Sequence, residues 1–126
     1  MTPIEVLSIA SEVYPLIKTG GLADVVGALP GALRSQRVAV RTLVPGYPAV
    51  LRALRRAETA LIRDDLFGGP ARVLACRAAG LDLFVLDAPH LYARPGGPYA
   101  GGAVMERLRG FVFHTAPQSR GPVDVG

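Results

Sequence analysis

The chain has 126 residues, of which half are hydrophobic and 19% are charged, and its formal net charge is +4. This length suffices for one domain with a core of its own, and so hydrophobic a composition excludes wholesale disorder. The positive charge comes from thirteen scattered arginines and a single lysine, and only four tyrosines and four phenylalanines are present for base stacking. A nucleic-acid partner is therefore not expected.

The sequence also lacks the signature of a membrane or secreted protein. No apolar run reaches the roughly 20 residues that span a bilayer, and the segment MTPIEVLSIASEVYP has no basic start of a secretion signal. Cys76 is the only cysteine, so an internal disulfide is excluded and a buried apolar role is expected for it. We expect a cytoplasmic protein.

The first half of the chain predicts a strand, a helix and a second strand. Residues 4–10 (IEVLSIA) are short and rich in branched apolar side chains, which predicts a buried strand. From Gly21 the period becomes helical, because an apolar stripe recurs at Leu22, Val25, Val26, Leu29 and Leu33. Pro30 lies within this stripe, so we expect a kink or a second helical segment there. Residues 38–44 (VAVRTLV) predict the second strand, which the turn PGYP ends.

The second half predicts a short helix followed by several strands. Residues 49–57 (AVLRALRRA) favour a helix whose three arginines form a solvated face. Three further segments predict strands, at 59–67 (TALIRDDLF), 71–78 (ARVLACRA) and 81–89 (LDLFVLDAP). This order indicates a βαβ start with a partly antiparallel extension, and hence an α/β fold class. After a loop dense in proline and glycine, residues 103–113 (AVMERLRGFVF) predict a short helix.

The segment KTGGLADVVGALP holds the one lysine and combines a glycine turn with a helix start. At such a start the first backbone N–H groups point outward unpaired, and the helix dipole adds partial positive charge, which suits an anion. Gly20 and Gly21 let a ligand approach the main chain closely, and Lys18 offers a point charge for a phosphate. Asp24, in the first turn, suits the dipole and can accept hydrogen bonds from sugar hydroxyls.

Two common phosphate-binding motifs do not match this sequence. A Walker A loop places its lysine after the glycines, and the dinucleotide fingerprint needs spaced glycines rather than an adjacent pair followed by Gly27. The remaining alternative is structural: a tight strand-to-helix connection that binds nothing, with Lys18 as an ordinary exposed lysine.

Three motifs in the same order resemble the bacterial glycogen synthases and plant starch synthases, the family-5 glucosyltransferases. They are SEVYPLIKTGGLADVVGALPGAL after a strand, VRTLVPGYP, and DAPHLYARPGGPY. The resemblance implies a GT-B fold built from two Rossmann-like halves. Residues 1–100 would then be the incomplete acceptor-side Rossmann-like half of the catalytic domain. Residues 101–126 depart from the family pattern, and we expect a divergent tail that is disordered or read out of frame.

The resemblance also implies a reaction and a set of binding residues. Family members transfer glucose from ADP-glucose, or in some cases UDP-glucose, to an α-1,4-glucan with retention of configuration. They require no metal ion or other cofactor, and neither nucleic acid nor membrane is a partner. The residues expected to contact the sugar nucleotide or line its cleft are Lys18, Gly20, Gly21, Asp24 and Tyr99.

Other residues receive weaker roles from the same resemblance. Glu12 is expected to face the acceptor side, His90 to fix a loop, and His114 to have no function. No catalytic residue is assigned within this chain, and we expect the 126 residues alone to be an inactive part of a glycogen synthase. The alternatives are a non-catalytic carbohydrate- or phosphate-binding module and another GT-B glycosyltransferase.

Overall fold

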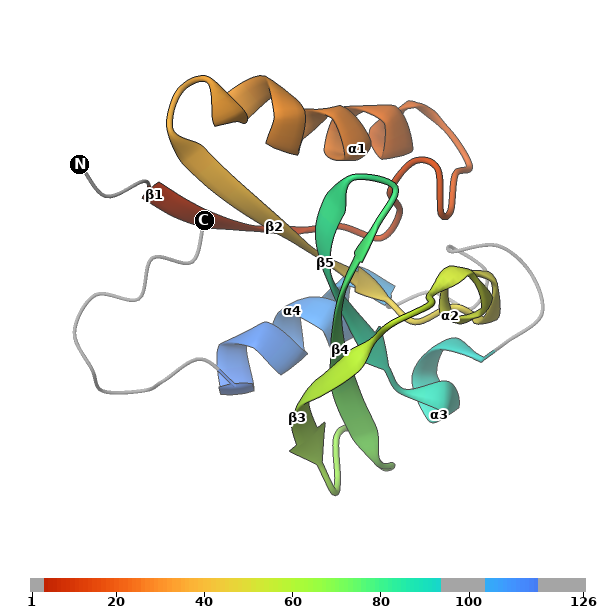
Figure 1. Cartoon of the computed structure of the whole chain (residues 1–126). Helices are drawn as coiled ribbons and strands as arrows, with labels where there is room; N and C mark the ends of the chain where they lie inside the picture. The colour runs from red at the N-terminus through yellow and green to blue at the C-terminus, as the bar shows by residue number, and fades with distance from the viewer. Residues whose placement is uncertain (1–3, 94–103, 116–126) are drawn as a thin grey trace.

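The computed structural model describes residues 4–93 and 104–115, which form one sheet flanked by helices (Figure 1). The sheet has five strands in the order β1-β2-β5-β4-β3. Their bounds are β1 Ile4–Ile9, β2 Val38–Pro45, β3 Glu58–Arg63, β4 Ala71–Ala78 and β5 Leu81–Asp87. β1, β2 and β5 are parallel to one another, whereas β4 and β3 continue the sheet antiparallel. The predicted α/β class with a βαβ start and an antiparallel extension is confirmed.

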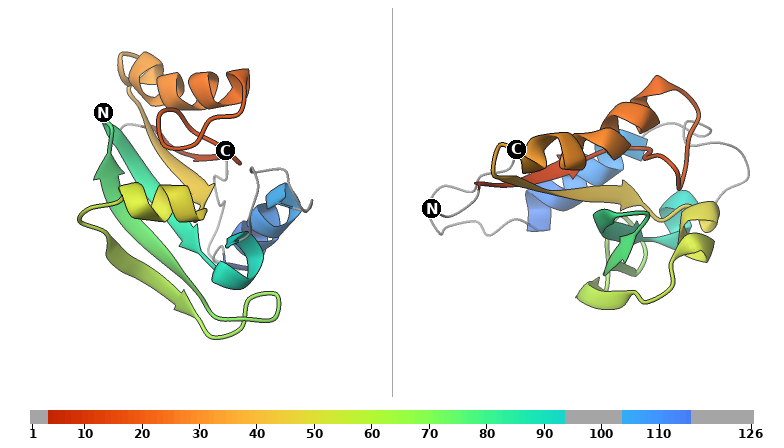
Figure 2. Two further views of the ribbon diagram at one scale, coloured as in Figure 1. Left: turned by 90° about the vertical axis from the view of Figure 1, so that its right-hand side faces the viewer. Right: turned by 45° about the horizontal axis from the view of Figure 1, so that its top comes forward.

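Four helices accompany this sheet, namely α1 Gly21–Arg34, α2 Pro48–Ala53, α3 Pro89–Tyr92 and α4 Val104–Thr115. In Figure 1, α1 lies above the β1–β2 half of the sheet and α4 lies below it. Figure 2 shows α2 across β4 and β5 on the side that faces the viewer in its left panel. None of the helices in the described ranges is long and apolar enough to cross a membrane.

The turns between elements follow from residue type. Gly80 and its neighbour Ala79 form the two-residue turn between β4 and β5, and both have positive φ, as a type I′ hairpin turn requires. Gly46, after β2, passes so close to the Leu86 carbonyl that an added Cβ would lie 2.8 Å from its oxygen. The parallel pairing of β2 with β5, which puts Pro45 opposite Leu86, places the carboxyl ends of the two strands beside each other.

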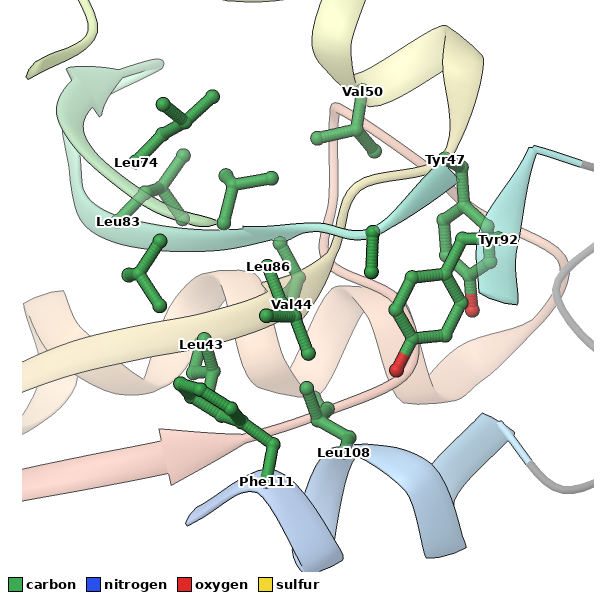
Figure 3. Close-up of a cluster of buried hydrophobic side chains, with 14 of the residues drawn as sticks. Leu43, Val44, Tyr47, Val50, Leu74, Leu83, Leu86, Tyr92, Leu108 and Phe111 are labelled. Carbon is green, nitrogen blue, oxygen red and sulfur yellow. The ribbon is translucent and has the colours of Figure 1, made fainter. Parts of the chain in front are cut away.

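The core joins side chains from both faces of the sheet. Leu43 and Val44 of β2 are neighbours in sequence and point to opposite faces, and both are buried. Figure 3 shows Leu108 and Phe111 of α4 pointing toward the strands on the Leu43 side, and both are at most 4% exposed. The fold therefore has a buried layer on each side of β2, and α4 closes one of them.

Helix α1 differs from its prediction in the face that it buries. Its buried residues are Ala23, Val26 and Pro30, whereas Leu22 is 48% and Val25 65% exposed. The predicted stripe is therefore right at Val26 but wrong at Leu22 and Val25, because Ala23 and the ring of Pro30 supply the rest of the packing face. The helix continues through Pro30 as one element, so a second segment does not begin there.

Helix α4 lies within residues 101–126, for which a divergent tail was expected. The short helix expected at residues 103–113 is confirmed, and its Leu108 is fully buried. This part of the expected tail is thus folded and packed, unlike the disordered tail that was expected. Residues 116–126 lie outside the described ranges, and the domain division at residue 100 stays a prediction.

Candidate functional site

The parallel strand β1 ends at the carboxyl edge of the sheet, and helix α1 begins near the same edge after a loop. In open α/β sheets this edge is where ligands bind. The loop from Ala10 to Gly20 runs along this edge before α1 starts (Figure 1). It carries Glu12 and Lys18, and it brings both close to the first turn of the helix.

Glu12 caps the start of α1 from within the protein. Its side chain is 1% exposed, and its carboxylate accepts a hydrogen bond from the Thr19 hydroxyl at 2.5 Å. It also accepts bonds from the backbone N–H groups of Gly20 at 3.3 Å and Ala23 at 3.2 Å. The N-cap residue Gly20 has no side chain for this purpose, so Glu12 takes the capping role from eight positions upstream.

This arrangement sets the ionisation of Glu12. Burial by itself raises the pKa of the carboxyl, but the hydrogen bonds from Thr19, Gly20 and Ala23 outweigh burial and hold the pKa below its ordinary value. Glu12 is thus a buried anion at neutral pH. Its oxygens are directed to the helix start, and the expectation that Glu12 faces the acceptor side stays a prediction.

Two N–H groups at the start of α1 keep no partner within the described part of the chain. Of the first helical donors, the Ala23 N–H is bonded to Glu12, while the N–H groups of Gly21 and Leu22 form no hydrogen bond with any described residue. Moreover, a Cβ added at Gly20 or Gly21 would meet nothing within 4 Å among the described atoms. Gly20 has φ of −164°, an extended conformation open to any residue. Packing therefore explains neither glycine of the pair, and the backbone conformation does not explain why residue 20 is a glycine.

Gly27 provides the contrast on the same helix. A Cβ there would lie 2.7 Å from the carbonyl oxygen of Tyr14, so Gly27 is required for the close packing of α1 on its own loop. Gly20 and Gly21 instead leave open space before the unpaired N–H groups. An external ligand can approach the main chain at that point.

Lys18 and Asp24 pair with each other at the border of this open space. The Lys18 Nζ lies 2.6 Å from the Asp24 Oδ2, and the two side chains are 44% and 51% exposed. The same Nζ lies 5.5 Å from the centroid of the Tyr14 ring. Four of the five predicted binding residues therefore gather at one helix start, and the fifth, Tyr99, lies outside the described residues.

Two tyrosines that the sequence did not single out stand at the carboxyl ends of β2 and β5. The rings of Tyr47 and Tyr92 meet edge to face with centroids 5.9 Å apart, as Figure 3 shows. Burial raises the pKa of the Tyr92 hydroxyl, which the Arg107 charge lowers slightly, so the group stays protonated. It has no hydrogen-bond partner within the described ranges. The only sequence signal for these two residues was a tyrosine shortly after a predicted strand, and no motif distinguished it.

His90 fixes a loop, as the sequence predicted. Its Nε2 lies 2.7 Å from the Leu66 carbonyl oxygen, so the ring nitrogen donates and the proton sits on Nε2. A Cβ at Gly69 would lie 2.6 Å from the imidazole ring. The side chain thus joins α3 to the β3–β4 loop. The side chain of His114 lies outside the described ranges.

Comparisons with known proteins agree on one family. The family model described as "Starch synthase catalytic domain" matches residues 5–116, which is most of the chain. The chain belongs to this family. A glycogen synthase from Rhodopseudomonas palustris (strain BisB18) is 65% identical over 101 residues, which are 80% of this chain and 21% of that protein. One from Acidiphilium cryptum (strain JF-5) is 67% identical over 96 residues, 76% of this chain and 20% of that protein.

A solved structure of the same family shows the same fold. The catalytic domain of starch synthase IV from Arabidopsis thaliana, bound to ADP and acarbose, aligns with a TM-score of 0.60 at 20% identity. The match covers 92% of this chain and 26% of that one. The predicted membership of the glycogen and starch synthase family, and the partial Rossmann-like fold of its catalytic domain, are confirmed.

The comparisons also show how much of a full-length relative this chain represents. The chain spans about a fifth of the length of the curated relatives that it matches. The family match runs to residue 116, and so includes α4, whereas the motif resemblance was expected to end near residue 100. In the residues that the structure describes, no three His, Cys, Asp or Glu side chains gather as metal ligands.

Proposed function

We propose that this chain is the N-terminal part of an ADP-glucose-dependent glycogen synthase, which extends an α-1,4-glucan with retention of configuration. The proposal rests on one observation beyond family membership. The start of α1 presents unpaired N–H groups at Gly21 and Leu22 behind a glycine pair that no internal packing requires. Such a start binds the phosphates of a nucleotide sugar.

In this proposal each side chain at the helix start has a separate task. Lys18 contributes a positive charge near the departing diphosphate, which stabilises the charge that develops when the glycosidic bond to phosphate breaks. Asp24 accepts hydrogen bonds from hydroxyls of the donor glucose. Because Lys18 and Asp24 pair at 2.6 Å in the free chain, binding exchanges part of that ion pair for contacts with the donor. Glu12 holds the Thr19–Gly20 turn and does not touch the substrate.

The 126 residues alone are expected to transfer no glucose. Retaining transfer requires donor phosphate, donor sugar and acceptor together in a closed, water-poor cleft, and the α1 start supplies one wall of such a cleft. We further propose that the protein acts in the cytoplasm. The open glycine pair is also compatible with a second candidate function, a module that binds carbohydrate or phosphate without catalysis.

A chimaera tests the proposal directly. The segment of the Rhodopseudomonas palustris enzyme that aligns with this chain at 65% identity is replaced by the present sequence, and glucose incorporation from ADP-glucose into glycogen is measured. We expect activity near that of the parent enzyme. Lys18→Gln in the chimaera should lower kcat about a hundredfold, the usual cost of losing one charge-stabilising donor. Arg52→Gln, an exposed change on α2, serves as the control and should leave the rate unchanged.

The outcomes separate the candidates. A folded chimaera without activity would contradict the glycogen synthase proposal. If the isolated chain then bound maltooligosaccharide or phosphate in a titration, the non-catalytic module would be favoured. An active chimaera that is indifferent to Lys18→Gln would keep the family activity but remove Lys18 from the donor site.

A further inference from the structure

A second pocket lies at the opposite end of α1, beyond the reach of the donor site. It has a volume of about 180 Å³ and lies between the C-terminal end of α1, the start of β2 and the β4–β5 turn. It is lined by Pro30, Arg34, Arg37, Val38, Ala39, Val40, Gly80 and Asp82. Helix α1 has 14 residues, so at about 1.5 Å per residue the two ends are roughly 20 Å apart.

The pocket carries an excess of positive charge. Arg34 and Arg37 both line it, and neither forms an ion pair with a carboxylate in the described parts of the chain. The one acidic group in the lining, Asp82, is neutralised by Arg77, whose Nη1 lies 3.3 Å from its Oδ1. Two guanidinium charges therefore remain uncompensated. They outweigh the partial negative charge that the helix dipole places at this end of α1.

The backbone at Arg37 is held in a conformation that is unfavourable for its residue type. Arg37 has φ of 61°, in the left-handed region that glycine or asparagine adopts more readily. Two hydrogen bonds fix it there: its N–H donates to the Arg34 carbonyl at 3.1 Å, and its carbonyl accepts from the Ile4 N–H at 3.1 Å. This fixed turn holds Arg37 beside the pocket that its side chain lines.

The pocket also has open space and an apolar floor. A Cβ at Gly80 would meet nothing within 4 Å among the described atoms, and Pro30 and Val40 contribute apolar surface to the same lining as the two arginines. Paired guanidinium groups suit a tetrahedral oxyanion, which accepts a bidentate bond from each. A dianion matches two charges better than a carboxylate does.

We propose that this Arg34–Arg37 pocket binds the phosphate group of a small phosphomonoester. The site is separate from the donor site at the start of α1 and goes beyond the glucosyl transfer proposed above. Its ligand class follows from the two unpaired guanidinium charges, the apolar floor and a volume that admits a phosphate with a small organic group.

Inorganic phosphate is the probe, titrated into the full 126-residue chain while backbone amide resonances are followed by NMR. Lys18→Gln is used as the background, so that any phosphate at the start of α1 does not confuse the result. We expect saturable shifts at residues 34–40 and 80–82 with a dissociation constant in the millimolar range. Sodium chloride at equal ionic strength should not reproduce them.

The variant Arg34→Gln/Arg37→Gln should weaken this binding at least tenfold. The matched control is Arg52→Gln/Arg55→Gln, which removes the same charge from exposed positions on and after α2 and should leave the binding unchanged. Equal weakening in both variants would reduce the effect to general charge attraction and overturn the proposal. The absence of saturable shifts in a chain whose spectrum is folded would overturn it as well.

Discussion

The clearest test of the structure is to remove the charge of Glu12 while keeping its shape. Glu12→Gln leaves one oxygen that can accept a hydrogen bond, but it replaces the other by an amide group that cannot. The retained oxygen can keep the bonds from the Gly20 and Ala23 N–H groups, which both donate to Oε1, whereas the Thr19 hydroxyl loses the Oε2 that accepts its bond. All bonds that remain to residue 12 then change from charge-assisted to neutral, which weakens the caps on Gly20 and Ala23 as well.

The expected cost follows from the number and kind of bonds. Hydrogen bonds to a charged group contribute about 1.5 to 3 kcal/mol each, against about 1 kcal/mol for neutral ones, and loss of a helix cap costs about 1 kcal/mol. The neutral side chain recovers part of this loss, since it no longer buries a charge. We expect Glu12→Gln to lower the free energy of unfolding by about 2 kcal/mol. For a domain of this size that corresponds to a fall in Tm of about 8 °C.

The pH dependence gives the effect a signature. The folded pKa of Glu12 is lowered, so the charged carboxylate contributes stability above the unfolded pKa of about 4.3, and that contribution is lost as pH falls through the folded pKa. The gap between wild type and Glu12→Gln should therefore be constant from pH 7 to about pH 5 and should close at lower pH. A merely steric effect of the substitution would not change with pH.

Urea denaturation followed by circular dichroism at a series of pH values measures this gap. Glu58→Gln is the control, because Glu58 is exposed on β3, and it should change stability by less than about 0.5 kcal/mol. If Glu12→Gln were as stable as wild type at pH 7, or if its deficit persisted unchanged to pH 3, the capping role argued for Glu12 would be refuted.

Two further pairs of substitutions test the packing around the site. Gly27→Ala should destabilise the chain by about 1 to 3 kcal/mol, because the new Cβ would lie 2.7 Å from the Tyr14 carbonyl oxygen. Gly31→Ala on the same helix meets nothing within 4 Å and should raise stability by about 0.5 to 1 kcal/mol; thermal melts that rank the two alike would contradict this packing. His90→Ala should cost about 1 to 2 kcal/mol through the loss of its hydrogen bond, and Gly69→Ala should cost a similar amount through collision with the imidazole ring. In the double variant the second cost should largely disappear, so a strictly additive double-mutant cycle would refute the contact.

The strands were the part of the fold that the sequence predicted best. The branched apolar runs at 4–10, 38–44, 71–78 and 81–89 differ from the observed strands by at most two residues at either end. Their composition leaves little choice, because β-branched residues in runs of this length suit a buried pleated surface. The antiparallel extension also followed from short turns that leave no room for a crossover helix.

The face of α1 could not be predicted in the same way. Counting large apolar residues gives a stripe through Leu22, Val25 and Val26, yet of these the helix buries only Val26, together with Ala23 and Pro30. The close approach of Tyr14 to Gly27 decides the matter, since the helix presents its smallest residues to the loop it must touch. Such tertiary contact between a loop and a helix leaves no periodic trace in the sequence.

The candidate site shows the same division. The residue types and spacing of the glycine pair and the lone lysine predicted a binding site at this helix start. No sequence pattern predicted that Glu12 caps the helix. Its discovery changes the electrostatics of the site. The described groups at the α1 start are two carboxylates, Glu12 and Asp24, and one ammonium group on Lys18.

That charge balance bears on how a glucosyl donor would be bound. With Glu12 ionised, the start of α1 carries a net side-chain charge of about −1, which offsets the positive end of the helix dipole. A diphosphate would therefore gain little from these side chains alone, and its attraction here would rest on the unpaired N–H groups of Gly21 and Leu22. In a working glycogen synthase, further cations must come from parts of the protein beyond the described residues. If the proposed function is right, Lys18 would orient the diphosphate against the helix, while cations outside the described residues would supply the greater part of the attraction.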